Sequence, residues 1–190
     1  MTRQLRSLSV ATAVALLALL TFLSAGPSSA YARSLTEAER ATLTKALDSF
    51  TTAMQANDTV SVVKAMPPLV LERMAEKFGV DVERTINGVA EEMAKGLKEI
   101  PFISSRFVIE SAKYYEAGDR APYAVIPSES VIAVDNGRKL LVRSNTLALC
   151  DEDSWYFIRL NDAAVTVVRE AYPDLPDIKV PPESSELVEN

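Results

Sequence analysis

A band of polar side chains crosses the otherwise apolar stretch between residues 122 and 160, and these residue types could do chemistry. Side chains alternate across a strand, so the band divides between two expected faces. One face carries Glu129, Ser144, Thr146 and Arg159, and the other carries Ser128, Ser130, Arg143 and Asn145. Because buried polar groups must be paired, the band indicates a structural Glu129–Arg159 pair, a level where the sheet emerges into water, or the lining of a pocket.

As a pocket, the band would bind a small molecule that carries an anionic group. Arg159 or Arg143 would hold that group, and aromatic residues would form the walls. The candidate ligand-binding residues are Tyr123, Glu129, Arg143, Ser144, Thr146, Trp155, Phe157 and Arg159.

A catalytic version of this site needs a carboxylate whose pKa is raised by burial, together with a hydrogen-bond donor to an enolate oxygen. Glu129 could serve as the base, and Tyr123 or Tyr115 as the donor. A neighbouring arginine, however, would lower the pKa of the glutamate instead. The sequence therefore assigns no catalytic residue.

The chain contains no histidine, which excludes several common sites. Ser-His-Asp and Cys-His nucleophilic sites, zinc sites with histidine ligands and the commonest general base are all ruled out. The acidic turn Asp151–Asp153 lacks the loop length of a calcium site. We expect neither a cofactor nor a metal.

Cys150 is the only cysteine, so the chain cannot form an internal disulfide. Its place on a strand opposite Trp155 favours a small buried apolar residue. A reactive thiol is the alternative, but the nearby carboxylates of Asp151–Asp153 would raise the pKa of that thiol.

The polar band lies in an expected antiparallel meander, because β-branched and aromatic runs alternate with short polar turns. Asn136-Gly137 predicts a two-residue type I′ turn, which would pair Glu129 with Ser144. A second tight turn at Glu152-Asp153 would pair Thr146 with Arg159, although a longer loop stays open there.

These registers place Tyr123 and Glu129 on the same face as Ser144, Thr146 and the aromatic side chains of the last strand. Both faces of the sheet are largely apolar. A sheet of this kind needs cover on both sides. We therefore expect helices on one face and either a partner chain or the C-terminal segment on the other.

Helices are expected before the meander, and they end in recognisable caps. Their ranges are 36–56, opened by a Thr36/Glu39 capping box, then 59–65, then from Pro68 to Gly79, and then Asp81 to Glu99. A first strand, Arg106 to Glu116, follows them. A last helix is expected after Asn161 or Asp162, and the acidic, proline-rich tail 173–190 is expected to be extended or disordered.

The first 32 residues resemble a secretory signal peptide, with Arg3 and Arg6, an apolar run and an Ala30-Tyr31-Ala32 cleavage site. Residues 33–172 would then form a single α+β domain in the periplasm or outside the cell, with no stable membrane span. Loss of the two arginines makes the formal charge of −6 more negative. Such acidity disfavours nucleic acid as a partner.

Helices first, then four antiparallel strands closed by the WYFIRL run and a short helix, resemble the NTF2-like superfamily of cone-shaped α+β barrels. The resemblance covers roughly residues 36–172. It implies a cavity between sheet and helices and frequent dimerisation through the outer face of the sheet. A strand pair usually found between the early helices is not evident, unless residues 100–105 supply part of it.

Taken together, the sequence favours an exported, non-catalytic protein of the cell envelope that binds a small ligand or a protein partner. The alternative is a cofactor-free lyase or isomerase of the NTF2-like type with a carboxylate base. Fold alone does not decide between them.

Overall fold

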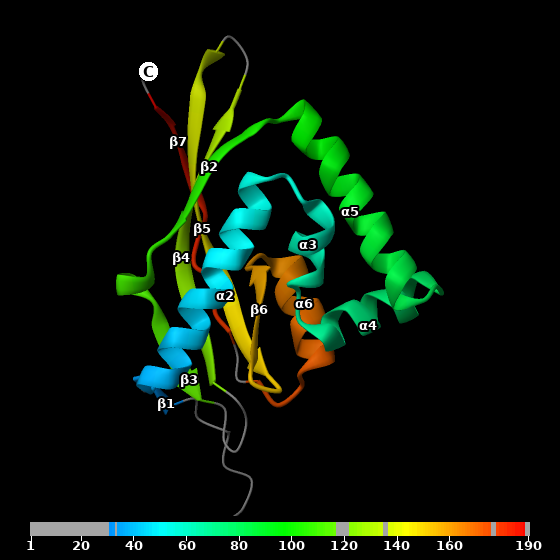
Figure 1. The fold of residues 1–190 in the computed structure, drawn as a ribbon, viewed down its shortest axis with the longest axis vertical. Coiled ribbons are helices and arrows are strands. Elements are labelled where there is room, and N and C mark those ends of the chain that lie inside the picture. The colour runs from blue at the N-terminus through cyan, green and yellow to red at the C-terminus, as the bar shows by residue number, and fades with distance from the viewer. Residues whose placement is uncertain (1–30, 33, 117–121, 135–136, 176–177, 189–190) are drawn as a thin grey trace, which may run out of the picture.

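The computed structural model describes residues 31, 32, 34–116, 122–134, 137–175 and 178–188. The predicted signal peptide therefore lies outside the described residues, apart from Tyr31 and Ala32. The chain is α+β, as the sequence predicts (Figure 1). Its elements are β1 (Tyr31–Ala32), α2 (Glu37–Gln55), α3 (Thr59–Lys64), α4 (Pro68–Phe78), α5 (Val82–Glu99), β2 (Phe102–Phe107), the short 3-10 helix η1 (Ile109–Ser111), β3 (Lys113–Glu116), β4 (Pro122–Ala133), β5 (Lys139–Asp151), β6 (Ser154–Arg159), α6 (Asp162–Ala171) and β7 (Ser184–Val188).

The helices begin at the predicted capping residues. Glu39 N donates to Thr36 Oγ1 at 3.2 Å and Thr36 N donates to Glu39 Oε2 at 2.8 Å, which is a capping box. Asp58, Asp81 and Asn161 accept from backbone N–H groups at the starts of α3, α5 and α6. None of the described helices is long and apolar enough to cross a membrane.

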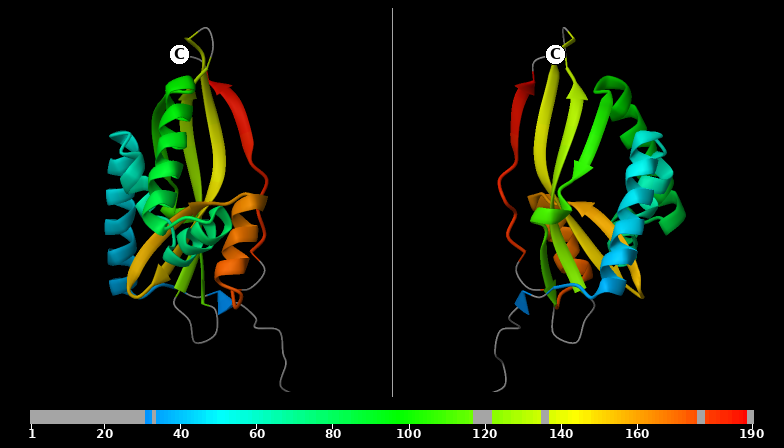
Figure 2. Two further views of the ribbon diagram at one scale, coloured as in Figure 1. Left: turned by 90° about the vertical axis from the view of Figure 1, so that its right-hand side faces the viewer. Right: turned by 60° about the vertical axis from the view of Figure 1, so that its left-hand side comes forward.

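The strands form one antiparallel sheet that curls into a half-barrel (Figure 2). The long strands β4 and β5 are its centre. The short strands β2 and β3 share one edge of β4, and β6 and β7 share the opposite edge of β5. Because α2 contacts both β2 and β6, the sheet curls around α2. We call the face toward α2 the inner face and the opposite one the outer face.

The prediction of one strand from Arg106 to Glu116 is wrong, since η1 separates β2 from β3. Val108 N donates to Pro127 O at 2.8 Å at this point. In an antiparallel strand the N–H and C=O of one residue point to the same neighbour, and proline has no N–H. Pro127 therefore interrupts the ladder. With this break, β1 and β7, the described sheet has seven strands where about four were expected.

The predicted register between β4 and β5 is wrong by one residue. Val134 N donates to Arg138 O at 2.9 Å, which leaves three residues between them, and Gly137 has φ 71°. A three-residue hairpin loop with glycine in the left-handed conformation fits this geometry. Glu129 consequently pairs with Arg143 and not with Ser144. A slip of one residue turns every side chain of β4 to the other face.

The predicted register between β5 and β6 is confirmed, including the pair Thr146–Arg159. Glu152 and Asp153 both have positive φ, at 47° and 64°. A two-residue turn of the type I′ family requires this conformation. The tight turn therefore forms without glycine.

Both faces of the lower half of the sheet are buried, and by different segments. Leu43 and Leu47 of α2 pack against inner-face residues such as Ile126 and Phe157. On the outer face, α6 and the segment that follows it pack against the cluster around Leu147. Figure 2 shows α2 and α6 on opposite sides of the sheet. Of the two covers expected for the second face, a partner chain or the C-terminal segment, the structure shows the C-terminal segment over the lower half.

The C-terminal tail, expected to be extended or disordered, is extended at β7 and is partly buried before it. Leu175 and Ile178 are buried in the outer-face core. Farther on, β7 pairs with the Lys139–Arg143 part of β5. The structured domain thus extends well beyond residue 172, and its last strand extends the edge of β5 beyond β6.

Candidate ligand-binding site

A cavity of about 590 Å³ lies between the upper inner face of the sheet and the helices α2, α3 and α5. Its size is that of a site for a small organic molecule. The described residues that line it are Phe50, Met54, Asn57, Thr59, Val62, Met93, Gly96, Leu97, Ile100, Phe102, Ser105, Phe107, Ser128, Ser130, Ile132, Val142, Ser144, Thr146 and Arg159.

The sheet side of the cavity carries a cluster of hydroxyl groups. Ser128 Oγ and Ser144 Oγ are 3.0 Å apart, and Thr146 Oγ1 donates to Ser128 Oγ at 3.4 Å. All three side chains are buried. Hydroxyls both donate and accept and can rotate to suit a partner. The cluster can therefore satisfy itself or turn toward a polar group of a ligand.

The helix side of the cavity is largely apolar apart from Asn57 and Thr59, and α5 supplies much of this apolar wall. The N-terminal half of α5 packs on α3 and α4 through Ile86, Val89 and Ala90. Its C-terminal half instead turns Met93, Leu97 and Ile100 toward the cavity. Met93 and Ile100 keep 36% and 51% of their surface exposed. The apolar stripe of α5 thus continues beyond the part of the helix that packs on α3 and α4. Its last apolar side chains form a wall of the cavity.

Arg159 lines the cavity on the β6 side, next to Thr146. Its guanidinium binds both carboxylate oxygens of Glu183, with Nε–Oε1 at 3.0 Å and Nη2–Oε2 at 2.7 Å. Among the described lining residues it is the one charged side chain. The predicted pair between Glu129 and Arg159 is therefore wrong.

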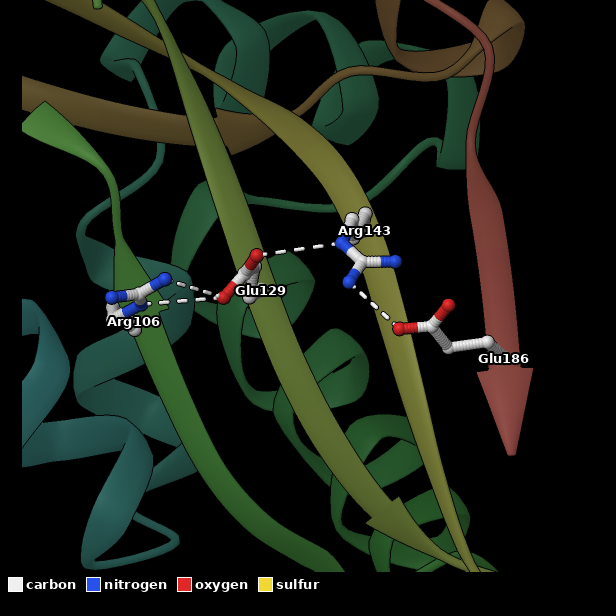
Figure 3. Close-up of polar contacts among 4 residues, drawn as sticks. All are labelled: Arg106, Glu129, Arg143 and Glu186. Atoms are coloured by element: carbon white, nitrogen blue, oxygen red, sulfur yellow. Dashed lines mark hydrogen bonds and ion pairs between the residues drawn. The ribbon is translucent and has the colours of Figure 1, made fainter. Parts of the chain in front are cut away.

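Glu129 lies on the outer face within a row of alternating charges that crosses four strands (Figure 3). Arg106 Nη2 lies 2.8 Å from Glu129 Oε2, Arg143 Nε lies 3.4 Å from Glu129 Oε1, and Arg143 Nη2 lies 2.7 Å from Glu186 Oε1. We call these four residues the outer ladder. Hydrogen bonding from Arg106, reinforced by Arg143, holds the pKa of Glu129 below its ordinary value.

Tyr123 also lies on the outer face, because it pairs with Leu149. Its ring stacks on Tyr115 with centroids 5.0 Å apart. Burial, and secondarily Tyr115, raises the pKa of Tyr123 to about 12. The side chain is part of the outer-face core and does not line the cavity.

Trp155 and Phe157 are on the inner face, but they line a second depression of about 470 Å³ between α2, α3 and β6. Small side chains such as Ala46, Ser49 and Ala53 form much of the rest of its described wall, together with Phe50 and Asp58. Trp155 Nε1 donates to Thr42 Oγ1 at 3.1 Å. These two aromatics thus belong to the packing of α2 on the sheet.

The structure therefore divides the predicted site. It brings together Ser144, Thr146 and Arg159, sets Trp155 and Phe157 apart at the second depression, and puts Tyr123, Glu129 and Arg143 on the outer face. Sequence reasoning missed the cavity residues on the helices. The available signal was the apolar stripe of α5, which continues to Ile100.

Cys150 is half-buried. Burial is the main cause that raises the pKa of its thiol, and the carboxylates of Asp153, Glu39 and Asp151 add to it. A raised pKa favours the protonated thiol over the nucleophilic thiolate at neutral pH. No group of three or more potential metal ligands occurs within the described part of the chain.

No protein-family model matches the chain, and no curated protein or solved structure matches it either. The resemblance to the NTF2-like superfamily therefore stays a prediction.

Proposed function

We propose that the protein is an exported, non-catalytic binding protein of the cell envelope that holds a small, largely apolar molecule between α5 and the sheet. The observation that carries this proposal is the cavity of about 590 Å³, with largely apolar helix walls and buried hydroxyls on its sheet side. A pocket that is mostly apolar with a few convergent polar groups is typical of small-molecule sites. The sequence pattern of residues 1–32 supports export.

The catalytic alternative receives no support from the geometry. Glu129, its expected base, lies on the outer face between Arg106 and Arg143. Those two guanidiniums lower the pKa of the carboxyl, whereas a general base of this type needs a raised pKa. The described lining of the cavity supplies no carboxylate in its place.

Binding of a protein partner, or of a second copy through the outer face, has weaker support than binding of a small molecule. The lower outer face is covered by α6 and the C-terminal segment. The upper outer face carries the outer ladder, so it does not form the apolar centre that a stable interface usually has.

A substitution on α5 can reduce the volume of the cavity, and the same helix offers a matched control. A Cβ added at Gly96 or at Gly88 meets no atom within 4 Å, but only Gly96 lines the cavity. We expect Gly96→Leu to weaken binding of the neutral fluorescent probe N-phenyl-1-naphthylamine, because the added side chain takes up part of the cavity, and Gly88→Leu to leave it unchanged. Both variants should fold, because leucine is a better helix former than glycine.

Fluorescence titration of the probe measures both variants. Equal affinity of Gly96→Leu and the unchanged protein for the probe would contradict the proposed site. If Gly96→Leu does bind less, native mass spectrometry of protein purified from the envelope would identify the natural ligand by the mass that this variant retains poorly.

A further inference from the structure

The junction between β6 and β7 lies at the rim of the cavity. Arg159 ends β6 opposite Thr146, and Ser184 begins β7 opposite Arg143. Both strands use the same edge of β5, so the junction falls beside Ser144, one of the buried hydroxyls. The Arg159–Glu183 ion pair bridges this junction.

Glu183 shows how a carboxylate fits Arg159. Two parallel N–H···O bonds, at 3.0 and 2.7 Å, form the forked arrangement that arginine makes with carboxylates. The side chains of Arg159 and Glu183 are 54% and 37% exposed. Both oxygens of Glu183 thus occupy a position that another carboxylate, entering from the cavity, could take.

Little else holds the chain around Glu183. Residues 182–188 are all exposed, and β7 buries no side chain. Besides its backbone pairing to β5, this segment makes the ion pairs Arg159–Glu183 and Arg143–Glu186 with the described residues. Exchange of the first pair therefore removes one of the two ion pairs that reinforce the backbone pairing of β7 with β5.

We propose that the ligand is an amphiphile with a carboxylate head, which replaces Glu183 at Arg159 while its apolar chain lies along α5, and that this exchange loosens β7. The inference rests on the proposed function. It adds the chemical class of the ligand and a response of the C-terminal strand to binding.

The exchange is physically inexpensive. One carboxylate replaces another on the same guanidinium, and an exposed ion pair shifts an equilibrium by about fivefold at most. Each methylene that the ligand buries against Met93, Leu97 and Ile100 strengthens binding by about fourfold. The apolar chain therefore supplies the affinity, and the head group supplies the selectivity.

The test compares dodecanoate with 1-dodecanol, which has the same chain and an uncharged head. Displacement of N-phenyl-1-naphthylamine measures the affinity of each, at monomeric ligand concentrations. We expect Glu183→Gln to strengthen dodecanoate binding by up to about fivefold, because the internal competitor is gone. Arg159→Gln added to Glu183→Gln should remove that gain, because the guanidinium that holds the head group is gone. Neither change should alter dodecanol.

Glu186→Gln is the matched control, because it breaks the other ion pair of the same strand on the outer face. It should leave both affinities unchanged. Hydrogen exchange gives the second readout, since dodecanoate but not dodecanol should speed exchange of the backbone amides of residues 184–188.

The outcomes separate this inference from the proposed function. If both compounds bind the cavity and no variant distinguishes them, or if β7 exchanges at the same rate with dodecanoate, the carboxylate exchange is overturned and the apolar site stands. If neither compound displaces the probe and the probe itself fails to bind, both proposals are overturned.

Discussion

The two faces of the upper sheet treat polar residues in opposite ways, although they are built from adjacent positions of the same strands. On the inner face, Ser128 and Ser144 are neutral, buried and bonded to each other. On the outer face, their neighbours Glu129 and Arg143 are charged and bonded to partners on β2 and β7. The contrast is therefore set by what covers each face.

Packing excludes water from the inner face around Ser128 and Ser144, and an ionised group at these positions would lose its hydration without a fixed partner. Hydroxyls tolerate that environment because they can satisfy one another. The outer face above α6 is open to water, where charges are retained at low cost. The inner face is thus suited to a ligand, and the outer ladder joins the short strands β2 and β7 to the centre of the sheet.

The largest expected effect comes from a charge moved to the wrong face. Ser128→Asp places a carboxylate among the buried hydroxyls, and we expect it to lower the free energy of unfolding by about 3–5 kcal/mol at neutral pH. Ser104→Asp, at an exposed outer-face position opposite Val131, should change stability little. Urea denaturation measures both variants.

Acidification sharpens this test. Burial raises the pKa of the introduced carboxyl in the folded state, so its penalty is present at high pH and should shrink as the pH falls and the group protonates. Similar losses in Ser128→Asp and Ser104→Asp would mean that the two faces do not differ in access to water.

A second comparison runs along the outer face of β5, between its covered and open halves. Leu147 is fully buried under the α6 cluster, whereas Leu141 lies half-buried near the ladder. Leu147→Ala should cost about 2–5 kcal/mol, because it removes a buried side chain and leaves a cavity. Leu141→Ala should cost about 1 kcal/mol, in proportion to the smaller area it buries. Thermal unfolding that ranks them equally would contradict the described cover.

Helix boundaries could be predicted from the sequence because capping is local chemistry. Thr36, Asp58, Asp81 and Asn161 each bond a backbone N–H group three residues away, and the same few residues carry the signal. The β5–β6 turn was also predicted, although glutamate and aspartate rarely adopt positive φ.

The β4–β5 register could not be fixed in this way. Asn136-Gly137 is compatible with a two-residue turn and with a three-residue loop that ends in glycine. Alternation normally decides between such registers, but both faces of these strands are apolar over much of their length, so the pattern specifies the register weakly. Because the predicted register was wrong by one residue, Tyr123 and Glu129 were expected on the face of Ser144 and Thr146 but lie on the outer face.

The sequence therefore predicted only the part of the candidate site that lies on β5 and β6. Ser144, Thr146 and Arg159 follow from the confirmed β5–β6 pairing. The helix wall depends on how α5 lies across the sheet, which is set by long-range packing on α3 and α4. No short sequence pattern predicts the angle at which α5 crosses the sheet.

The smallest expected effect concerns the outer ladder, whose charged side chains lie on the part of the sheet that is open to water. Arginine contacts lower the folded-state pKa of Glu129 and of Glu186. A lowered pKa contributes stability that is present above the ordinary pKa of glutamate and is lost as the pH falls through the folded value. Glu129→Gln should therefore flatten the acid limb of the plot of melting temperature against pH, and Glu72→Gln, an exposed change on α4, should not. At about 1 M salt, where the screening length is about 3 Å, the difference between the two variants should shrink. A difference that survives high salt undiminished would show that the ladder is shielded from water, and the contrast between the two faces would then need another cause.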